Sequence, residues 1–447
     1  MTEASRNLSS WGRFHKVSAA RVKTLEWRYQ QLPSGSLTEK LLPYALGRSY
    51  GDSCLNSSHT HLLTQHLDRV LSFDRLRGIL RCEAGLSLAA ILELVLPEGW
   101  FLPVSPGTKW VSVGGAIAND VHGKNHHRAG NFGHHLREFE LLRSDGQRLA
   151  CSPTSNRDYF SATIGGLGLT GLITWAEIQL QPVLGPWIRQ QTLCFANLEE
   201  FFTLSRQSLT HYAYTVAWID SLAHGKNLGR GVFFQGNHGN KEDLAQLTIP
   251  RKKLATAVRT FPCDLPSWAF NRFSVGLFNQ AYYRRQKMRG SAPTLVHYEP
   301  FFYPLDAVHH WNRMYGGKGF FQYQCVLPFA EGHQALGEML RVIAQSGMGS
   351  FLAVLKEFGE IPSLGLLSFP RPGVTLALDF ANRGAPLLAL LDRLDAITRA
   401  AGGSVYPAKD ARMSGEDFRC YFPRWEEFLA YIDPRFSSDF WRRVMEK

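Results

Sequence analysis

Apolar residues follow two patterns along the chain. Between about residues 41 and 183, short runs typical of β-strands alternate with glycine-rich turns, and helical spacing is clear at 88–95, before Pro97. This part is expected to be rich in loops. Between about residues 187 and 403, longer elements are expected: strands at 319–329, 351–358, 374–380 and 404–406, and helices at 336–347 and 387–402.

The order of these elements predicts an α+β fold class. Strands and helices that follow one another in this way favour an antiparallel sheet with helices packed on one face. The last forty or so residues return to helical patterns, and Ser414 and Asp417 can form a capping pair there. The sequence contains no internal repeat.

Composition narrows the class of protein. The 447 residues are 45% hydrophobic and 19% charged, which excludes a fibrous or disordered chain and suggests two domains, or three. The net charge of +11 favours an anionic partner: nucleic acid, a phosphorylated substrate or an acidic membrane surface. Seven scattered cysteines without a CxxC pair, no secretory signal and no apolar run of about 18 residues predict a cytoplasmic protein.

One segment carries most of the positive charge. Residues 251–289 hold nine basic residues and one acid, and aromatic residues follow Ser267, a residue type favoured at helix N-caps. The pattern predicts a basic amphipathic helix suited to an anionic interface, and a core helix with solvated basic ends is an equal alternative. Because the charges cluster at the ends of the segment, a nucleic-acid groove is disfavoured and no nucleic-acid partner is expected.

Two glycine-rich patterns resemble phosphate-binding signatures but lack their context. Gly166, Gly168 and Gly171 spell GxGxxG, yet a strand pattern follows where a dinucleotide-binding fold needs a helix. Gly123-Lys124 lacks the hydroxyl residue and the earlier glycine of a P-loop. The sequence therefore supports neither nicotinamide nor nucleoside triphosphate binding.

A loop at residues 114–127 combines small residues with histidines. Successive small residues let a ligand approach backbone N–H groups, which suits a pyrophosphate. Five of the sixteen histidines lie between His122 and His135, so a metal site is the alternative. His122 and His126 have helical spacing, but the surrounding glycines oppose a helix, and no metal site is predicted.

Further motifs occur in one order along nearly the whole chain. They are LGRSYGD at 46–52, PGT at 106–108, VGGA at 113–116, HGKNHH at 122–127, GGLGLTG at 165–171, YTVAWID at 214–220, FQYQCV at 321–326, LK at 355–356, LSFPRPG at 367–373, AKDAR at 408–412 and FPR at 422–424. The first five resemble the FAD domain of the p-cresol methylhydroxylase (PCMH) and vanillyl-alcohol oxidase superfamily. Within it, the chain is most similar to the decaprenylphosphoryl-β-D-ribose oxidase family, the flavoprotein half of a 2'-epimerase.

This resemblance implies a two-domain PCMH-type fold. An FAD-binding domain would comprise residues 1–185, completed by 404–447, and a substrate domain, 186–403, would carry a basic aromatic flap at 251–293. FAD would be held without a covalent bond, because Tyr50 and Gly51 stand where many relatives have a flavin-linking histidine. The cofactor contacts implied are Gly47, Arg48, Ser49, Tyr50, Gly51, Asp52, Gly107, Thr108, Gly114, Gly115, Ala118, Asn119, His122, Gly123, Lys124, Asn125, Gly168, Gly171, Tyr406 and Lys409.

Oxidation of a secondary alcohol needs geometry, a proton acceptor and positive charge near flavin N1 and C2=O. Lys409 matches the family's active-site lysine, which would orient the substrate hydroxyl and stabilise reduced flavin; Gln324 and Lys356 are the other catalytic candidates. Lys356 lies in an apolar strand and therefore needs an anion or a carboxylate nearby. The substrate contacts expected are Trp218, otherwise a core residue, with Gln322, Gln324, Lys356, Thr375 and Ala377.

The expected reaction is hydride transfer from C2 of a polyprenyl-phosphoryl pentose to flavin N5. A separate NAD(P)H-dependent short-chain reductase would complete epimerisation, and segment 251–289 would hold the protein peripherally at the inner face of the membrane. The alternatives are a soluble alditol or aldonolactone oxidase and a flavin-free lipid- or RNA-binding protein. Ala377 stands where the mycobacterial enzymes carry a cysteine, so the sugar and its carrier stay open.

Overall fold

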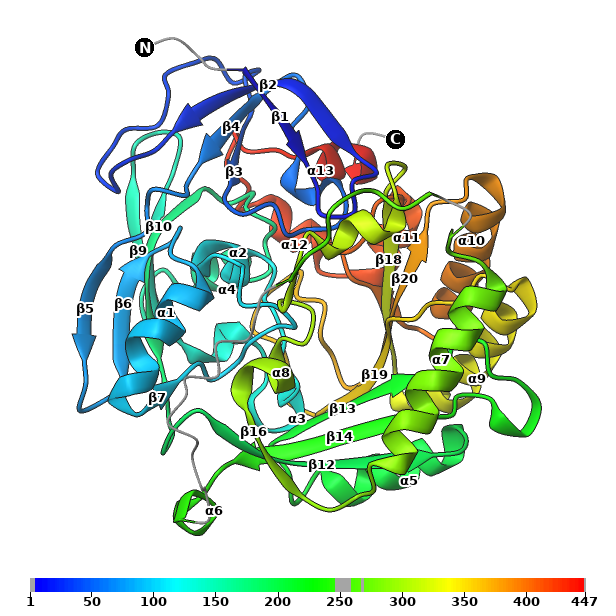
Figure 1. Ribbon diagram of the computed structural model, residues 1–447. Coiled ribbons are helices and arrows are strands. Elements are labelled where there is room, and N and C mark those ends of the chain that lie inside the picture. Colours follow the sequence, from blue (N-terminus) through cyan, green and yellow to red (C-terminus); the bar gives the residue numbers. More distant parts are fainter. Residues whose placement is uncertain (1–4, 246–258, 267–268, 446–447) are drawn as a thin grey trace.

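The computed structural model describes residues 5–245, 259–266 and 269–445 (Figure 1). A four-stranded sheet near the N-terminus has the order β1 (Ser5–Ser9), β2 (Lys16–Thr24), β4 (Thr60–Leu63), β3 (Leu41–Tyr44). A five-stranded antiparallel sheet follows, in the order β5 (Val70–Asp74), β6 (Ile79–Glu83), β10 (Leu172–Gln179), β8 (Leu136–Leu142), β9 (Arg148–Cys151). Strand β10 is the strand expected after the GxGxxG glycines, which confirms that no Rossmann helix follows them.

Short helices and long loops complete this first part of the chain. The helices are α1 (Leu88–Val95), α2 (Val113–Ala118), α3 (His126–Ala129) and α4 (Arg157–Thr163), with a short pair of β7 (Trp100–Phe101) and β11 (Gln181–Pro182). Helix α1 covers the predicted residues, and the Ser87 side chain accepts a hydrogen bond from the Ala90 amide at its start. Histidines 122 and 126 do not share a helix, because α3 begins at His126.

An eight-stranded antiparallel sheet dominates the second part. Its strands, in spatial order, are β16 (Thr294–His297), β12 (Trp187–Phe195), β14 (Gly231–His238), β13 (Tyr214–Ile219), β19 (Ala353–Phe358), β20 (Gly373–Ala381), β18 (Phe320–Leu327) and β21 (Ser404–Val405). The predicted strands of this region are thus all present. Helices α5 (Leu198–Ser208), α9 (Phe329–Ser346) and α10 (Ala385–Ala400) share a core cluster with one face of the sheet, which confirms the α+β layer.

Helix α7 (Arg272–Met288) lies on the other face of the sheet, where the ring centres of its Tyr282 and of Trp218 on β13 are 4.7 Å apart. It begins after Asn271, whose side chain accepts hydrogen bonds from the amides of Phe273 and Ser274. The N-cap expected at Ser267 lies outside the described residues, as do Arg251, Lys252 and Lys253. Other short elements here are α6 (Lys241–Ala245), β15 (Arg259–Thr260), α8 (Tyr298–Phe302) and β17 (Val308–His309).

The C-terminal segment returns to the N-terminal loops. Helices α11 (Gly415–Tyr421), α12 (Trp425–Leu429) and α13 (Asp439–Met445) form this segment; α13 lies near β1 in Figure 1, and α11 contacts α13 and β21. The Tyr50 amide donates to the Ala408 carbonyl at 2.8 Å, and Asp52 pairs with Arg443 at 2.7 Å. Division of the chain into two domains at residues 185 and 404 stays a prediction. Within the described ranges, no helix has both the length and the apolar character needed to cross a membrane.

Candidate active site

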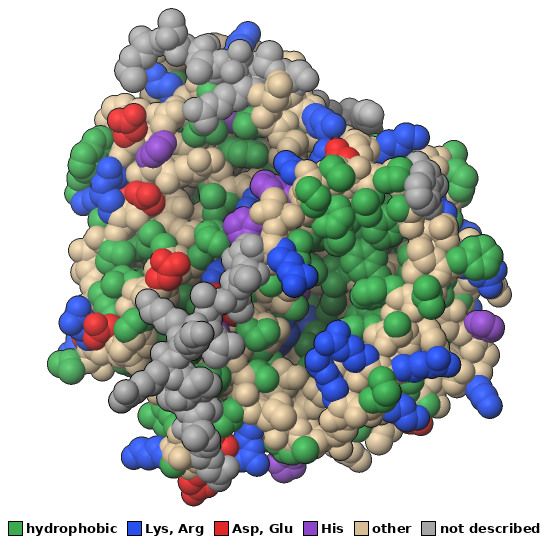
Figure 2. All heavy atoms as spheres, in the orientation of Figure 1, with side chains coloured by type: hydrophobic (Ala, Val, Ile, Leu, Met, Phe, Trp, Pro, Cys, Tyr) green, Lys and Arg blue, Asp and Glu red, His purple; other side chains and the backbone are tan. Residues whose placement is uncertain are grey.

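A cavity of about 1430 Å³ lies between the glycine-rich loops and one face of the eight-stranded sheet. Figure 2 shows this side of the molecule hollowed, with hydrophobic side chains inside the hollow and Lys and Arg side chains near its rim. All but three of the site residues predicted from the sequence line this cavity. Loops and sheet therefore meet at one place, and we call their surfaces the loop wall and the sheet wall.

The loop wall presents backbone rather than side chains. Gly47 has a φ of +57°, which a residue with a side chain rarely adopts, and it turns the chain into the cavity. Among the described residues, the amides of Gly47, Arg48 and Ser49 have no hydrogen-bond acceptor. The Arg48 guanidinium lies over the ring of Trp11 at 4.4 Å. Free amides beside a cation form a concave surface suited to an anion.

The three predicted cofactor contacts outside the cavity wall are Gly51, Asp52 and Asn125. A Cβ on Gly51 would lie 1.4 Å from the carbonyl oxygen of Asp410, so this glycine permits the C-terminal segment to approach. Asp52 binds Arg443 through two hydrogen bonds, and the Asn125 side chain donates to the Pro103 carbonyl at 2.8 Å. We therefore assign these residues to packing of the loops.

Lys409 lies at the junction of the two walls. Its ammonium nitrogen is 3.8 Å from the centre of the Tyr50 ring, and the Tyr50 side chain lies close to Gln322 on β18. Gln322 Nε2 donates to Asp379 on β20 at 2.5 Å, and Tyr315 donates to the same carboxyl at 3.4 Å. A chain of contacts thus links the Lys409 cation to a buried acid.

Burial acts on both ends of this chain. It lowers the pKa of Lys409, and the negative charge of Asp379 opposes that shift. Burial raises the pKa of Asp379, while its hydrogen bond from Gln322 and the charge of Lys409 act in the other direction. The charge of each group therefore favours the charged form of the other.

A second polar network surrounds His122. Lys356 Nζ lies 2.8 Å from His122 Nδ1 and donates to the Gly123 carbonyl at 2.8 Å. Gln324 Nε2 lies 3.0 Å from His122 Nε2 and 3.3 Å from the Thr375 hydroxyl. Both ring nitrogens of His122 are thus engaged by residues of the sheet wall.

Unlike Lys409, the cavity lysines Lys356 and Lys124 pair with no acidic side chain among the described residues. Burial, with the charges of Lys124 and Lys409, lowers the pKa of Lys356 well below its usual range. Burial and the Lys356 charge likewise lower the pKa of His122, and burial brings the pKa of Lys124 to about 8. The anion or carboxylate expected beside Lys356 is therefore replaced by a neutral histidine and a carbonyl, and the cavity favours an anionic occupant.

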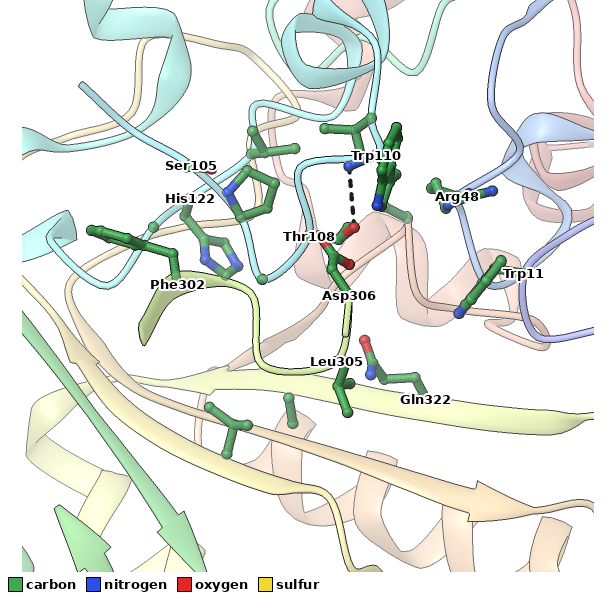
Figure 3. Close-up of a pocket in the computed structure, with 18 of the residues that line it drawn as sticks. Trp11, Arg48, Ser105, Thr108, Trp110, His122, Phe302, Leu305, Asp306 and Gln322 are labelled. Carbon is green, nitrogen blue, oxygen red and sulfur yellow. Dashed lines mark hydrogen bonds between the residues drawn. The ribbon is translucent and has the colours of Figure 1, made fainter. Parts of the chain in front are cut away.

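A strap made of residues 299–306 joins the two walls (Figure 3). The Asp306 carboxylate accepts a hydrogen bond from the Lys109 amide at 2.9 Å, and Lys109 also pairs with Glu299. The hydroxyl oxygens of Tyr303 and Ser105 lie 2.5 Å apart. In Figure 3 Asp306 lies between the loop that carries Thr108 and Gln322 of the sheet wall.

Comparison with known proteins identifies this arrangement. Residues 37–152 match the family model described as FAD binding domain. The chain is 34% identical to the decaprenylphosphoryl-β-D-ribose oxidase of Mycolicibacterium smegmatis, over 98% of this chain and 97% of that protein. The chain belongs to the decaprenylphosphoryl-β-D-ribose oxidase family. Members of this family are FAD-dependent oxidoreductases acting on CH–OH groups, which confirms the predicted fold, cofactor and enzyme class.

Two further relatives of this chain show how far the sequence similarity extends. An uncharacterised protein of Streptomyces coelicolor, described by its place in the mprA 5' region, is 35% identical over 80% of this chain and 100% of its own length. A putative D-arabinono-1,4-lactone oxidase of Neurospora crassa is 29% identical over 38% of this chain and 32% of its own length. The similarity to this lactone oxidase is therefore confined to part of each protein.

The residues of the cavity fit FAD. The free amides of Gly47, Arg48 and Ser49 suit the pyrophosphate, and the Lys124 cation, which pairs with no acid among the described residues, suits an electron-rich ring that gains negative charge. The other loop-wall residues that would hold it are Gly107, Thr108, Gly114, Gly115, Ala118, Asn119, His122, Gly123, Gly168, Gly171 and Tyr406. Within the described residues, no group of three or more metal-binding side chains occurs.

Some site residues of this oxidoreductase were missed from the sequence. Asp379 follows Ala377 by two positions on one strand, so the argument applied to Lys356, a charge within an apolar strand, would have found it. Asp306 and Trp11 line the cavity from irregular segments that carry no motif. The role of His122 as a bridge between Lys356 and Gln324 needed the three-dimensional arrangement.

Proposed function

We propose that this protein oxidises a secondary alcohol of a sugar attached to a polyprenyl phosphate, with C2 of a pentose as the reacting carbon. The observation that carries this proposal is the sheet wall, where Gln322, Gln324 and Thr375 offer groups for sugar hydroxyls beside Lys356 and the Lys124 cation. A cation that has no acidic partner among the described residues suits a phosphate as well as the flavin. The relative from Mycolicibacterium smegmatis is a decaprenylphosphoryl-β-D-ribose oxidase, which supports the same substrate class.

Bound FAD supplies a two-electron acceptor for the hydride that leaves the carbon. Lys409, whose charge Asp379 supports, orients the substrate hydroxyl and stabilises negative charge that develops during transfer. Lys356 accepts the hydroxyl proton, because its lowered pKa makes the neutral amine accessible. These roles make Lys409 and Lys356 the catalytic pair, and Gln324 holds His122 in place.

Protonation of Lys356 is coupled to its neighbours. With Lys356 neutral, His122 Nδ1–H donates to it and Gln324 Nε2 donates to His122 Nε2. With Lys356 charged, it donates to Nδ1, the ring proton moves to Nε2, and the Gln324 amide turns its oxygen to the ring. The network can therefore follow the proton taken from the substrate while both ring nitrogens of His122 stay paired.

The test is anaerobic reduction of the flavin. The purified protein should be yellow, and acid precipitation should leave the colour in the supernatant, because the cofactor is held without a covalent bond. Farnesylphosphoryl ribose should bleach the flavin, whereas xylitol and gulonolactone should not. Bleaching by either of these free compounds instead would favour an alditol or aldonolactone oxidase. Colourless protein that FAD cannot reconstitute would contradict an FAD-dependent oxidation.

We also infer that α7 contacts an anionic membrane, which would place the protein at the inner membrane surface. Phe273, Leu277 and Met288 are 85%, 73% and 81% exposed, and they follow one stripe of the helix with Arg284. Replacement of Arg284, Arg285 and Lys287 by Gln should weaken sedimentation with phosphatidylglycerol vesicles and leave the flavin spectrum unchanged. Equal sedimentation of variant and wild type would contradict this contact.

The ketone formed by such an oxidation keeps its lipid carrier. A separate NAD(P)H-dependent short-chain reductase would convert it to the epimeric alcohol, because this chain offers no nicotinamide-binding motif. Product released after flavin reoxidation should be a substrate for a reductase of that class. Recovery of the starting sugar alone would contradict this pairing.

A further inference from the structure

The sheet wall of the cavity is a groove that crosses several strands. Side chains directly opposite one another on antiparallel strands point to the same face of the sheet. Gln324 pairs with Ala377, Ala377 with Val354, and Val354 with Trp218. One row of side chains therefore runs from β18 to β13.

The neighbouring row continues the groove toward the other edge of the sheet. Val216 pairs with Phe234, Phe234 with Thr192, and Gln190 with Thr294 of β16. All of these side chains line the cavity. With strands about 4.8 Å apart, the distance from β18 to β12 is roughly 24 Å.

The chemistry of this groove changes along its length. At one end lie the polar residues of the proposed sugar site, including Gln324, Thr375 and Lys356. The middle consists of Ala377, Val354, Trp218, Val216 and Phe234, which we call the apolar strip. Thr192, Gln190 and Thr294 make the far end polar again.

The apolar strip has no polar atom left to satisfy. The indole N–H of Trp218 donates to the Phe351 carbonyl at 2.8 Å, so the ring offers the cavity only apolar surface. Helix α7 covers this part of the groove, with Phe278 and Tyr282 lining the cavity and Gln286 and Arg289 beyond them. The strip is thus an apolar passage between two polar ends.

Helix α7 is fixed over the strip by a buried polar clamp. Asn279 is fully buried and donates to Asp220 at 2.8 Å, while Arg230 binds the same carboxylate at 2.7 Å and also reaches Gln280 of the helix. Because Asn279 lies one position after Phe278, this clamp fixes the side of the helix that faces the sheet. The roof of the passage is therefore held in place before any ligand binds.

We propose that the apolar strip binds the hydrocarbon chain of the lipid-linked substrate, with its head group at Lys356 and the polar end of the groove. A linear chain fits because the passage is continuous with the sugar site and apolar on both sheet and helix sides. The cations at the head-group end match a phosphate between sugar and hydrocarbon. This inference rests on the proposed function and adds to it the place where the carrier lies.

The first experiment compares phosphoryl riboses that carry one or three isoprene units, assayed without vesicles. Burial of each methylene group can strengthen binding by up to about fourfold, so the longer substrate should have a KM at least about tenfold lower in the wild type. Val216→Asn should remove most of this advantage, so that the KM of the longer substrate rises toward the KM of the short one. Val216→Leu should retain the advantage, and Leu277→Asn, on the exposed side of α7, is the matched control.

The second readout needs no turnover. Calorimetry of farnesyl phosphate with the FAD-loaded protein should detect binding that Val216→Asn weakens by about tenfold and that inorganic phosphate does not reproduce. Equal affinity of Val216→Asn and wild type for farnesyl phosphate would overturn the assignment of the strip. Flavin bleaching that is independent of chain length would also overturn it and leave the proposed function intact. Farnesyl phosphate binding lost in Val216→Asn, without bleaching by any phosphoryl ribose, would support the strip and contradict the proposed function.

Discussion

The two walls of the cavity are built by different means. The loop wall offers glycines and free amides from segments far apart in the sequence, such as Gly47 and Gly168. The sheet wall offers alternating side chains from strands held in a fixed register, such as Gln322 and Gln324. A wall of backbone can enclose a large anionic cofactor closely, whereas a wall of side chains can vary in chemistry from strand to strand.

This difference separates cofactor binding from chemistry. In and directly behind the loop wall, the most damaging substitutions should be those that add side-chain atoms where the packed backbone leaves no space. On the sheet wall and at Lys409, most changes that matter should remove a functional group and leave the fold and the flavin in place. Four predictions test this division.

The largest effect is expected at Lys409, where the two walls meet. Lys409→Ala should bind FAD with an unchanged absorbance spectrum but slow flavin reduction by at least about 100-fold, because the cation that orients the hydroxyl is gone. Stopped-flow reduction under anaerobic conditions measures this rate. Lys409→Arg keeps the charge and should recover part of the lost rate. A wild-type rate of flavin reduction in Lys409→Ala would show that Lys409 has no role in the reaction.

Directly behind the loop wall, where the C-terminal segment packs on the loops, the corresponding change is Gly51→Ala. The added Cβ would overlap the backbone oxygen of Asp410, which cannot move as a side chain can, so we expect a loss of about 3 kcal/mol in the free energy of unfolding. Gly107→Ala is the matched control, because no atom lies within 4 Å of its added Cβ. Thermal and denaturant unfolding of both variants give the comparison, and equal stability would contradict it.

Asp379→Asn tests the charge relation across the sheet wall. The negative charge of Asp379 raises the pKa of Lys409, so its removal should lower that pKa. Lys409 then loses its proton at a lower pH, and the alkaline limb of the rate of flavin reduction should move to lower pH. A limb that stays in place while the maximal rate falls would indicate a structural role for Asp379 instead.

The two walls also differed in what the sequence revealed. The glycine-rich motifs predicted many residues of the loop wall, although Gly51, Asp52 and Asn125 lie outside it. Helical and strand periodicity predicted β18, β20, α9 and α10. Sequence periodicity alone could not supply strand order, because pairing of β13 with β19 joins residues far apart in the chain. Without that pairing, the residues of the apolar strip cannot be recognised as neighbours.

Contacts between distant polar groups were also hidden from the sequence. His122 was predicted as a cofactor contact, but its partners Lys356 and Gln324 come from strands more than two hundred residues later. Asp52 belongs to a cofactor-binding motif, yet it pairs with Arg443 in the C-terminal helix. A motif identifies a loop, and tertiary packing decides which of its side chains face the ligand.

The smallest effect is expected where the strap ties one wall to the other. Tyr303 and Ser105 are both buried, and among the described residues each hydroxyl bonds only the other. Either Tyr303→Phe or Ser105→Ala therefore leaves one hydroxyl without this partner. Each single change should cost about 1 kcal/mol in the free energy of unfolding. The double variant should cost less than the sum, because it leaves no unpaired group. Strict additivity in this double-mutant cycle would mean that the hydroxyls do not couple the walls, whereas positive coupling with unchanged flavin reduction would limit the strap to holding them together.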